Sequence, residues 1–158
     1  MRKLEGVKMT ITEFKKVLKQ CVKTQGFEYE NKNYCLNLDK IIIIISVQKS
    51  NYGIDDYYIN YGFYVKDIHK NNFNCAKITE CDIRGRFYDE TDGKGDLFSL
   101  GALSSSEFEE IINFNIRKVI VPVMENGIEE YFKKFPNAFC AAKLSLKEYL
   151  EPAKERRT

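Results

Sequence analysis

The chain has 158 residues, of which 44% are hydrophobic and 30% are charged, and its formal net charge is +2. A chain of this length forms one domain that buries about two thirds of its unfolded surface. So small a net charge gives no electrostatic reason to expect binding to nucleic acid or to an anionic membrane surface. We therefore expect a single domain over residues 1–158 and no nucleic-acid partner.

The charges are spread unevenly along the chain. Residues 1–25 hold seven basic and two acidic side chains, and residues 26–142 hold 13 basic and 18 acidic ones. Residues 143–158 hold five basic and three acidic ones. The body of the chain is therefore acidic, and both of its ends are basic.

The cysteines predict a reducing compartment. The chain has five cysteines: Cys21, Cys35, Cys75, Cys81 and Cys140. Their number is odd, no two form a C-x-x-C pair, and the chain contains only one histidine that could complete a metal site with them. We expect free, mostly buried thiols. The N-terminus lacks the apolar run of a secretory signal, and no apolar run approaches the roughly 18 residues of a membrane helix. A soluble cytoplasmic protein without a membrane partner is the expectation.

The first element predicted in chain order is an amphipathic helix over residues 10–25. Thr10 and Glu13 have the spacing of a capping box, in which each side chain satisfies a backbone N–H of the other residue. Apolar residues then recur at intervals of three and four, with lysines on the opposite side: Ile11, Phe14, Leu18, Cys21 and Val22. The lysine side is interpreted as a solvated outer surface.

Several strands follow the helix. Residues 41–45 are five consecutive isoleucines, and a β-branched run without alternation predicts a central strand that is covered on both faces. Residues 57–65 alternate apolar and polar or small side chains, which predicts a strand with one face in the core. Shorter strands are expected at residues 27–30, 33–38 and 79–88.

From Ser104 onward the period becomes helical again. Ser104 with Glu107, or Ser106 with Glu109, has the spacing of a capping box, and Pro122 is expected to break or kink the helix that follows. Further helical pieces are expected at residues 123–135 and 144–150. The order of elements predicts an α+β fold: an N-terminal helix, an antiparallel sheet of about four to five strands, and C-terminal helices packed on the sheet.

Four segments carry a resemblance to a known family: Gly26-Phe27, Gln48-Lys49-Ser50, the strand 58–64 and the element 81–86. In their order and spacing they resemble a bacterial family catalogued only as domain of unknown function 4304. The resemblance covers roughly residues 10–125 and leaves a C-terminal helical extension over residues 126–158. It implies a stand-alone bacterial cytosolic domain with no assigned activity, and it supplies no catalytic residues.

A first candidate site combines Gln48, Lys49 and Ser50 at one strand end with Arg84 and Arg86, which share one side of a short strand. If these two ends converge, three cations and an amide could hold a phosphate or a carboxylate, with arginine offering paired donors. The alternative interpretation is structural, with the cations neutralised by the nearby aspartates Asp55, Asp56 and Asp82.

A second candidate site is the other face of the strand 57–65, which carries Tyr58, Asn60 and Tyr64. Tyrosine combines an apolar ring with a polar hydroxyl, which suits a wet protein-binding surface. The alternative is that a covering element buries these same residues.

The remaining polar features do not form a metal, cofactor or catalytic site. Residues 89–96 cluster carboxylates around glycine but miss the ligand spacing of a calcium loop, so we interpret them as a solvated acidic turn. His69 lies in a polar stretch, and we interpret it as a surface residue because the sequence pairs it with no nucleophile.

These observations favour a non-enzymatic protein-binding module, of the immunity type or an accessory partner. The alternative is a protein that binds a small anion or a phosphorylated ligand, or a weak enzyme, using Lys49, Arg84 and Arg86. A third hypothesis is a homodimer formed through the uncovered sheet face.

Overall fold

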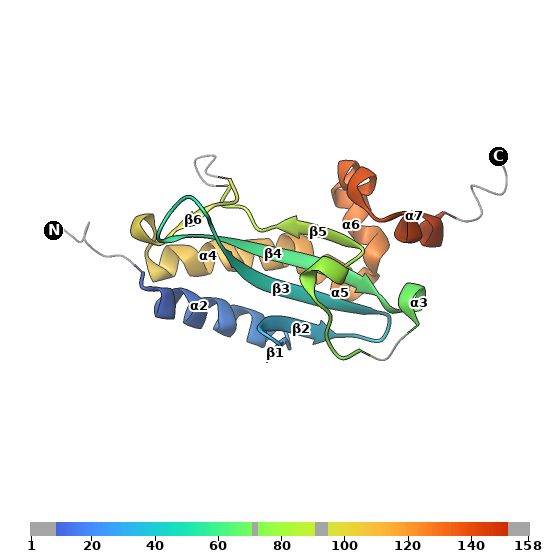
Figure 1. The fold of residues 1–158 in the computed structure, drawn as a ribbon, viewed down its shortest axis with the longest axis horizontal. Coiled ribbons are helices and arrows are strands. Elements are labelled where there is room, and N and C mark those ends of the chain that lie inside the picture. Colours follow the sequence, from blue (N-terminus) through green and yellow to red (C-terminus); the bar gives the residue numbers. More distant parts are fainter. Residues whose placement is uncertain (1–8, 71–72, 91–94, 152–158) are drawn as a thin grey trace.

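The computed structural model describes residues 9–70, 73–90 and 95–151. Over these ranges the chain forms the predicted α+β fold, with helices on one face of an antiparallel sheet (Figure 1). The strands are β1 (Glu28–Glu30), β2 (Asn33–Asn37), β3 (Ile41–Lys49), β4 (Asp56–Val65), β5 (Ile83–Arg86) and β6 (Phe98–Ser99). Within these ranges the sheet has six strands, where about four to five were expected, because the short β6 pairs with the beginning of β4.

The isoleucine strand β3 lies inside the sheet, as its sequence predicts. The strands follow the order β1-β2-β3-β4-β5, and the short β6 pairs with the beginning of β4. Ile43 lies opposite Phe63, and Ile45 lies opposite Tyr61. All five isoleucines, Ile41–Ile45, are buried. Because neighbouring side chains of a strand point to opposite faces, both faces of the sheet must be covered at β3.

The described residues also form six α-helices. Helix α2 begins after Thr10, and the predicted capping box between Thr10 and Glu13 is present. The Ser104–Glu107 capping box begins α4 in the same way. The helices are α2 (Ile11–Thr24), α3 (Lys66–His69), α4 (Ser105–Asn115), α5 (Val121–Asn126), α6 (Ile128–Lys134) and α7 (Leu144–Leu150). Short 3-10 turns lie at Ile78–Glu80, Leu100–Ala102 and Pro136–Ala141.

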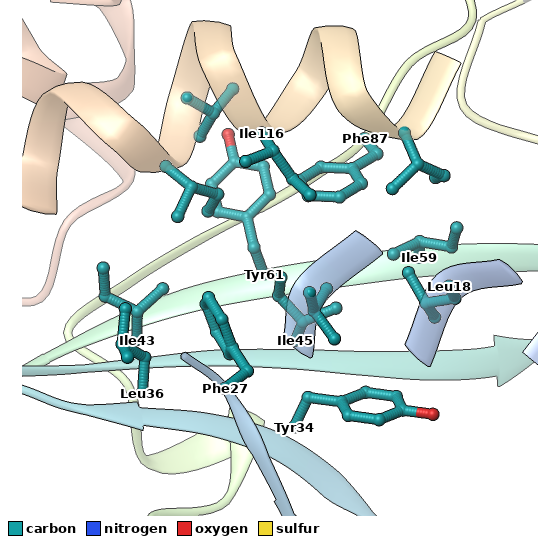
Figure 2. Packing of buried hydrophobic residues seen from close by; sticks show 14 of the residues in the cluster. Leu18, Phe27, Tyr34, Leu36, Ile43, Ile45, Ile59, Tyr61, Phe87 and Ile116 are labelled. Atoms are coloured by element: carbon teal, nitrogen blue, oxygen red, sulfur yellow. The ribbon is translucent and has the colours of Figure 1, made fainter. Parts of the chain in front are cut away.

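The main core lies between the sheet and the helices. Helices α2 and α4 run side by side across one face of the sheet (Figure 1), where the Phe14 and Phe108 rings stack with centroids 4.5 Å apart. Figure 2 shows side chains of β3 and β4 meeting Leu18 and Ile116 in this layer. The C-terminal extension contributes to the same core through Ile128, Tyr131 and Leu146.

The second face of the sheet is covered by residues 73–82, which we call the covering segment. Ala76 and Cys81 of this segment pack on Ile42, Ile44 and Tyr64. A Cβ atom at Gly62 would come within 2.8 Å of the Cys81 Cβ, so only glycine at this position of β4 lets the segment lie against the strand. The cover is partial because it ends before the far ends of β3 and β4.

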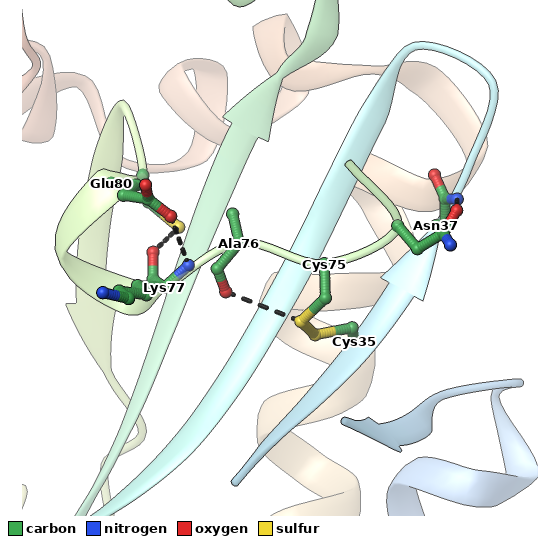
Figure 3. Close-up of a disulfide and its surroundings, with 8 residues drawn as sticks. Cys35, Asn37, Cys75, Ala76, Lys77 and Glu80 are labelled. Atoms are coloured by element: carbon green, nitrogen blue, oxygen red, sulfur yellow. Dashed lines mark hydrogen bonds between the residues drawn. A yellow bond between two sulfur atoms is a disulfide. The ribbon is translucent and has the colours of Figure 1, made fainter. Parts of the chain in front are cut away.

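A disulfide between Cys35 of β2 and Cys75 joins the covering segment to the sheet (Figure 3). The expectation of five free thiols is therefore wrong for this pair. Cys21, Cys81 and Cys140 remain free. Sequence spacing could not find the pair because 40 residues separate the two cysteines, and only the folding of the segment over β2 brings them together.

Pro122 does not break the helix. Helix α4 continues through a π-helical turn at Ile116–Ile120 directly into α5. Proline has no N–H for the carbonyl four residues earlier, and its ring would crowd that carbonyl in a regular α-helix. The wider π turn accommodates the proline. The break comes instead at Gly127, between α5 and α6, so the single helix expected at residues 123–135 is wrong.

We expect Ile44→Ala to lower the free energy of unfolding by about 2–5 kcal/mol, because it opens a cavity under the covering segment. Ile54→Ala is the matched control, since Ile54 is 84% exposed and its truncation should change stability by less than about 0.5 kcal/mol. Urea denaturation measures both values. Equal effects of the two substitutions would show that the covering segment does not bury the second face.

We expect iodoacetamide to modify Cys140 rapidly in the native protein, because this thiol is exposed. Burial, with Glu109 nearby, raises the pKa of Cys21 to about 11, and burial beside Asp82 raises the pKa of Cys81 to about 12. Both thiols should therefore react slowly.

Mass spectrometry of the alkylated protein should count three modified cysteines in urea without a reductant and five after reduction. Five modified cysteines without a reductant would contradict the disulfide.

Candidate functional site

The structure separates the residues of the predicted anion site. Gln48 and Lys49 are neighbours in β3, so their side chains point to opposite faces of the sheet. The Lys49 ammonium lies 5.4 Å from the centroid of the Tyr57 ring, on the helix side. The buried Ser50 hydroxyl accepts a hydrogen bond from the Tyr52 N–H. The three predicted cations therefore do not meet at one point.

Arg86 and Gln48 do come together, on the part of the second face beyond the covering segment. The Arg86 Nε donates to the Asn60 Oδ1 at 3.1 Å, and a terminal nitrogen donates to the Gln48 Oε1 at 3.4 Å. Another terminal nitrogen pairs with Asp96 at 3.2 Å, and the guanidinium lies 3.8 Å from the centroid of the Tyr58 ring. These partners satisfy Arg86 within the protein. Arg84 is exposed and lies opposite Gly62 in the register.

The predicted partner-binding residues do not share one exposed surface. Tyr58 and Asn60 are partly exposed at the uncovered end of the sheet, where they hold Arg86. Tyr64 is only 2% exposed, and its ring stacks on His69 with centroids 4.1 Å apart. The expectation that a covering element buries this face holds at Tyr64 and not at Tyr58 or Asn60.

His69 is not a plain surface residue. Its Nε2 lies 2.9 Å from a carboxylate oxygen of Asp82, which is fully buried and also accepts the Val65 N–H at 2.8 Å. The neighbouring Cys81 stays protonated because burial raises the pKa of its thiol to about 12, and that thiol points to the Lys77 carbonyl. The histidine and aspartate therefore serve to hold the end of β4 to the covering segment.

Sequence reasoning missed a groove beside α4, which we call the acidic groove. It encloses about 710 Å³ and is lined by Tyr88, Glu90, Glu107, Glu110, Phe114 and Arg117, among other residues. Asp89 adds a further acidic side chain to its lining. Four acidic residues therefore meet one arginine along its walls.

The periodicity of α4 explains why these side chains gather. Phe108, Ile112 and Asn115 form the buried stripe of the helix. The next stripe consists of residues spaced by three or four positions, all of which line the groove: Glu107, Glu110, Ile111 and Phe114. Phe114 is 42% exposed, although aromatic side chains usually bury most of their surface. This second stripe was the available sequence signal.

Asn115 holds the two walls of the groove together. Its amide accepts the Tyr88 N–H at 3.0 Å and donates to the Tyr88 carbonyl at 2.8 Å and to the Ile111 carbonyl at 2.8 Å. The side chain is 3% exposed. Buried hydrogen bonds of this kind fix Tyr88, two residues after the end of β5, against α4, so the groove is preformed.

Neither a metal site nor a membrane-spanning helix is found in the described ranges 9–70, 73–90 and 95–151. There, no cluster of three or more histidine, cysteine, aspartate or glutamate side chains could hold a metal ion. No helix in the same ranges has the length and apolarity needed to span a membrane. The predicted acidic turn at residues 89–96 falls partly outside the described residues.

Comparison with protein families gives one result. The family model described as "Domain of unknown function (DUF4304)" matches residues 18–126, which include the sheet, the covering segment and both walls of the acidic groove. Comparison with curated proteins found no match, and comparison with solved structures found none either.

We expect Asn115→Ala to lower the free energy of unfolding by about 1–3 kcal/mol, because the buried Tyr88 N–H and carbonyl lose their partner. Asn113→Ala is the control, since this residue lies on the same helix and is partly exposed. Chemical denaturation gives both values. Equal effects would contradict the role of Asn115 in joining the two walls.

Proposed function

The chain belongs to the DUF4304 family, whose description assigns no activity, and we propose that it is a non-enzymatic protein-binding module that holds a basic segment of another protein in the acidic groove. The observation that carries the proposal is the second stripe of α4, where exposed carboxylates and an exposed aromatic ring line one preformed groove. No step of this binding requires a general acid, a general base or a nucleophile.

Charge complementarity selects the partner. Glu107, Glu110 and Glu90 make the groove negative, which favours encounter with a lysine- or arginine-rich segment and disfavours an acidic one. Lys118 pairs with Glu90 at the groove's edge, so Glu110 is the more available carboxylate. Opposite charges across an interface raise the association rate and set specificity more than they add affinity.

The apolar part of the groove supplies the contact area. Tyr88 is 49% exposed and Phe114 is 42% exposed, and both line the groove. Aromatic side chains at the centre of an interface contribute a large share of its binding energy. The bound segment therefore combines basic residues with an apolar residue that packs on these rings.

An immunity-type or accessory role agrees with such a partner, because a protein that neutralises a basic toxin presents an acidic, aromatic surface. This step is an analogy between surfaces. A cytoplasmic location is part of this proposal and rests on the same analogy, not on the cysteines. The Cys35–Cys75 disulfide removes the thiol argument for a reducing compartment, since disulfides persist mainly in oxidising ones.

The two earlier alternatives are less favoured by the geometry. Lys49 faces the helices while Arg86 is satisfied on the other face, so a small-anion site made of Lys49, Arg84 and Arg86 has no common centre. A homodimer through the second sheet face would have to use the uncovered end alone, because the covering segment occupies the rest.

We expect a short lysine-rich peptide carrying one phenylalanine to bind the protein, and Glu110→Lys to weaken this binding by about fivefold or more, because the added charge repels the peptide. Phe114→Ala should weaken it by about tenfold through lost ring contact. Isothermal titration calorimetry measures each dissociation constant.

Two controls make the experiment decisive. Glu109→Lys makes the same charge change on the same helix at a residue that does not line the groove, and it should leave binding unchanged within about twofold. The same peptide with glutamate in place of lysine should not bind. Equal weakening by Glu109→Lys and Glu110→Lys would contradict the groove as the site.

A cellular arm tests the natural partner. A protein that is captured by the wild type and by Glu109→Lys, but is lost with Glu110→Lys and Phe114→Ala, supports the proposal. Recovery of only a second copy of the chain, with a dimeric mass by light scattering, would contradict it.

A further inference from the structure

A second pocket adjoins the acidic groove and shares Tyr88 and Glu90 with it, while its other lining residues are not used by the proposed function. It encloses about 450 Å³, a size that accommodates a small organic molecule. Its walls come from β4 and β5 on one side and from the π turn and α6 on the other. The residues that matter for its chemistry are Tyr61, Gly85, Lys118, Tyr131, Lys134 and Phe135. We call it the tyrosine pocket.

Two buried phenols meet in the wall of this pocket. The hydroxyls of Tyr61 and Tyr131 lie 2.8 Å apart, and these residues are 5% and 4% exposed. Burial raises the pKa of both side chains, so both are protonated at neutral pH. Each hydroxyl carries one hydrogen, and their mutual hydrogen bond uses only one of the two. Within the described ranges, no protein acceptor is found for the second hydrogen.

Such a donor is costly to bury without a partner. An unsatisfied buried hydroxyl loses its hydration without gaining a hydrogen bond, which destabilises the folded protein. Two phenylalanines would fill the same space without that cost. Since the pair lines a pocket, an acceptor atom inside that pocket can satisfy the spare O–H.

Gly85 creates the space for this arrangement. A Cβ atom at this position of β5 would overlap the Tyr61 hydroxyl and ring. Glycine inside a strand weakens it and often marks a place where another group approaches closely. Here the approaching group is the Tyr61 phenol, so the strand is built to admit the hydroxyl pair.

The rim of the pocket carries a positive charge that Pro122 helps to place. Because proline has no N–H, it cannot donate to the carbonyl of Lys118, four residues earlier. The Lys134 Nζ lies 3.3 Å from that carbonyl oxygen. A carbonyl does not neutralise an ammonium, and an ammonium has three donors. The Lys118 side chain is instead paired with Glu90. Lys134 is therefore the rim cation that a ligand can use.

We propose that the tyrosine pocket binds a small organic anion, a carboxylate or a phosphate ester, with an apolar body. The anionic oxygen accepts the spare hydrogen of the Tyr61–Tyr131 pair, and Lys134 supplies the opposite charge at the rim. The apolar body packs on Val119, Phe135 and Ala138, which also line the pocket. Of the predicted anion cluster only Arg86 lines this pocket, and its guanidinium is already held by Gln48, Asn60 and Asp96, whereas Lys49 and Arg84 do not line the pocket.

Phenylacetate and phenyl phosphate are the probes, because they share a ring and differ in the oxyanion. Calorimetric titration of the full chain should detect binding of at least one of them, and 2-phenylethanol, which lacks the charge, should bind at least about tenfold more weakly. Preference for one probe identifies the carboxylate or the phosphate as the anion that the site takes.

Two variants locate the site. The double substitution Tyr61→Phe and Tyr131→Phe keeps both rings and removes both hydroxyls, and Lys134→Gln removes the charge at the exposed rim; each variant should weaken binding by about tenfold or more. Lys133→Gln is the matched control, since the Lys133 side chain is 75% exposed and does not line the pocket. It should bind the probe like the wild type.

The two proposals can be tested independently, because the acidic groove binds a peptide and the tyrosine pocket binds a small anion. Glu110→Lys, which should weaken peptide binding in the acidic groove, should leave probe binding unchanged. Absence of binding of both probes to the folded wild type would overturn the inference. So would equal binding by the wild type, by the Tyr61→Phe and Tyr131→Phe double variant and by Lys134→Gln, and Lys134→Gln serves as the test even if the double variant fails to fold.

Discussion

Burial of strand β3 on both faces is the constraint on which the rest of the structure depends. The strand lies between β2 and β4, and its five isoleucines must leave water above and below the sheet. Burying an isoleucine side chain stabilises the fold by about 1.5–3 kcal/mol. Helices α2 and α4 cover one face, and the covering segment, tied by the Cys35–Cys75 disulfide, covers the other.

The helices on one face of the sheet and the covering segment on the other determine which surfaces remain exposed for binding. The covering segment buries Tyr64 in a small second core. At the uncovered end of the sheet, the polar side chains Gln48, Asn60 and Asp96 bond to Arg86 of the same chain. The second face of the sheet therefore presents few side chains that are free to contact a partner. The exposed aromatic and acidic side chains lie instead on the outer stripe of α4.

The passage from α4 to α5 links the fold to both pockets. Asn115 is the last residue of α4, and its side chain bonds to the backbone of Tyr88. Tyr88 lines both the acidic groove and the tyrosine pocket. The π turn follows at once and accommodates Pro122 without ending the helix. Such turns often occur at functional sites, because the extra residue displaces side chains from their regular positions. Here the turn places Lys118 and Val119 in the wall of the tyrosine pocket.

The sequence by itself determined the elements whose cause is local. Thr10–Glu13 and Ser104–Glu107 begin two helices, the isoleucine run predicts an interior strand, and the alternation in residues 57–65 orients β4. The order of these elements was enough to predict the α+β class. Each of these features rests on spacing within a few residues, which a sequence displays directly.

Only the tertiary structure decided the features that join distant residues. Cys35 meets Cys75, His69 meets Asp82, and Tyr61 meets Tyr131 across 70 residues of chain. The register of β3 on β4 also sends Lys49 away from Arg86, which no motif could indicate. The physical reason is that side-chain contacts depend on sheet register and on which helix covers which face, and these are fixed by packing the whole core at once.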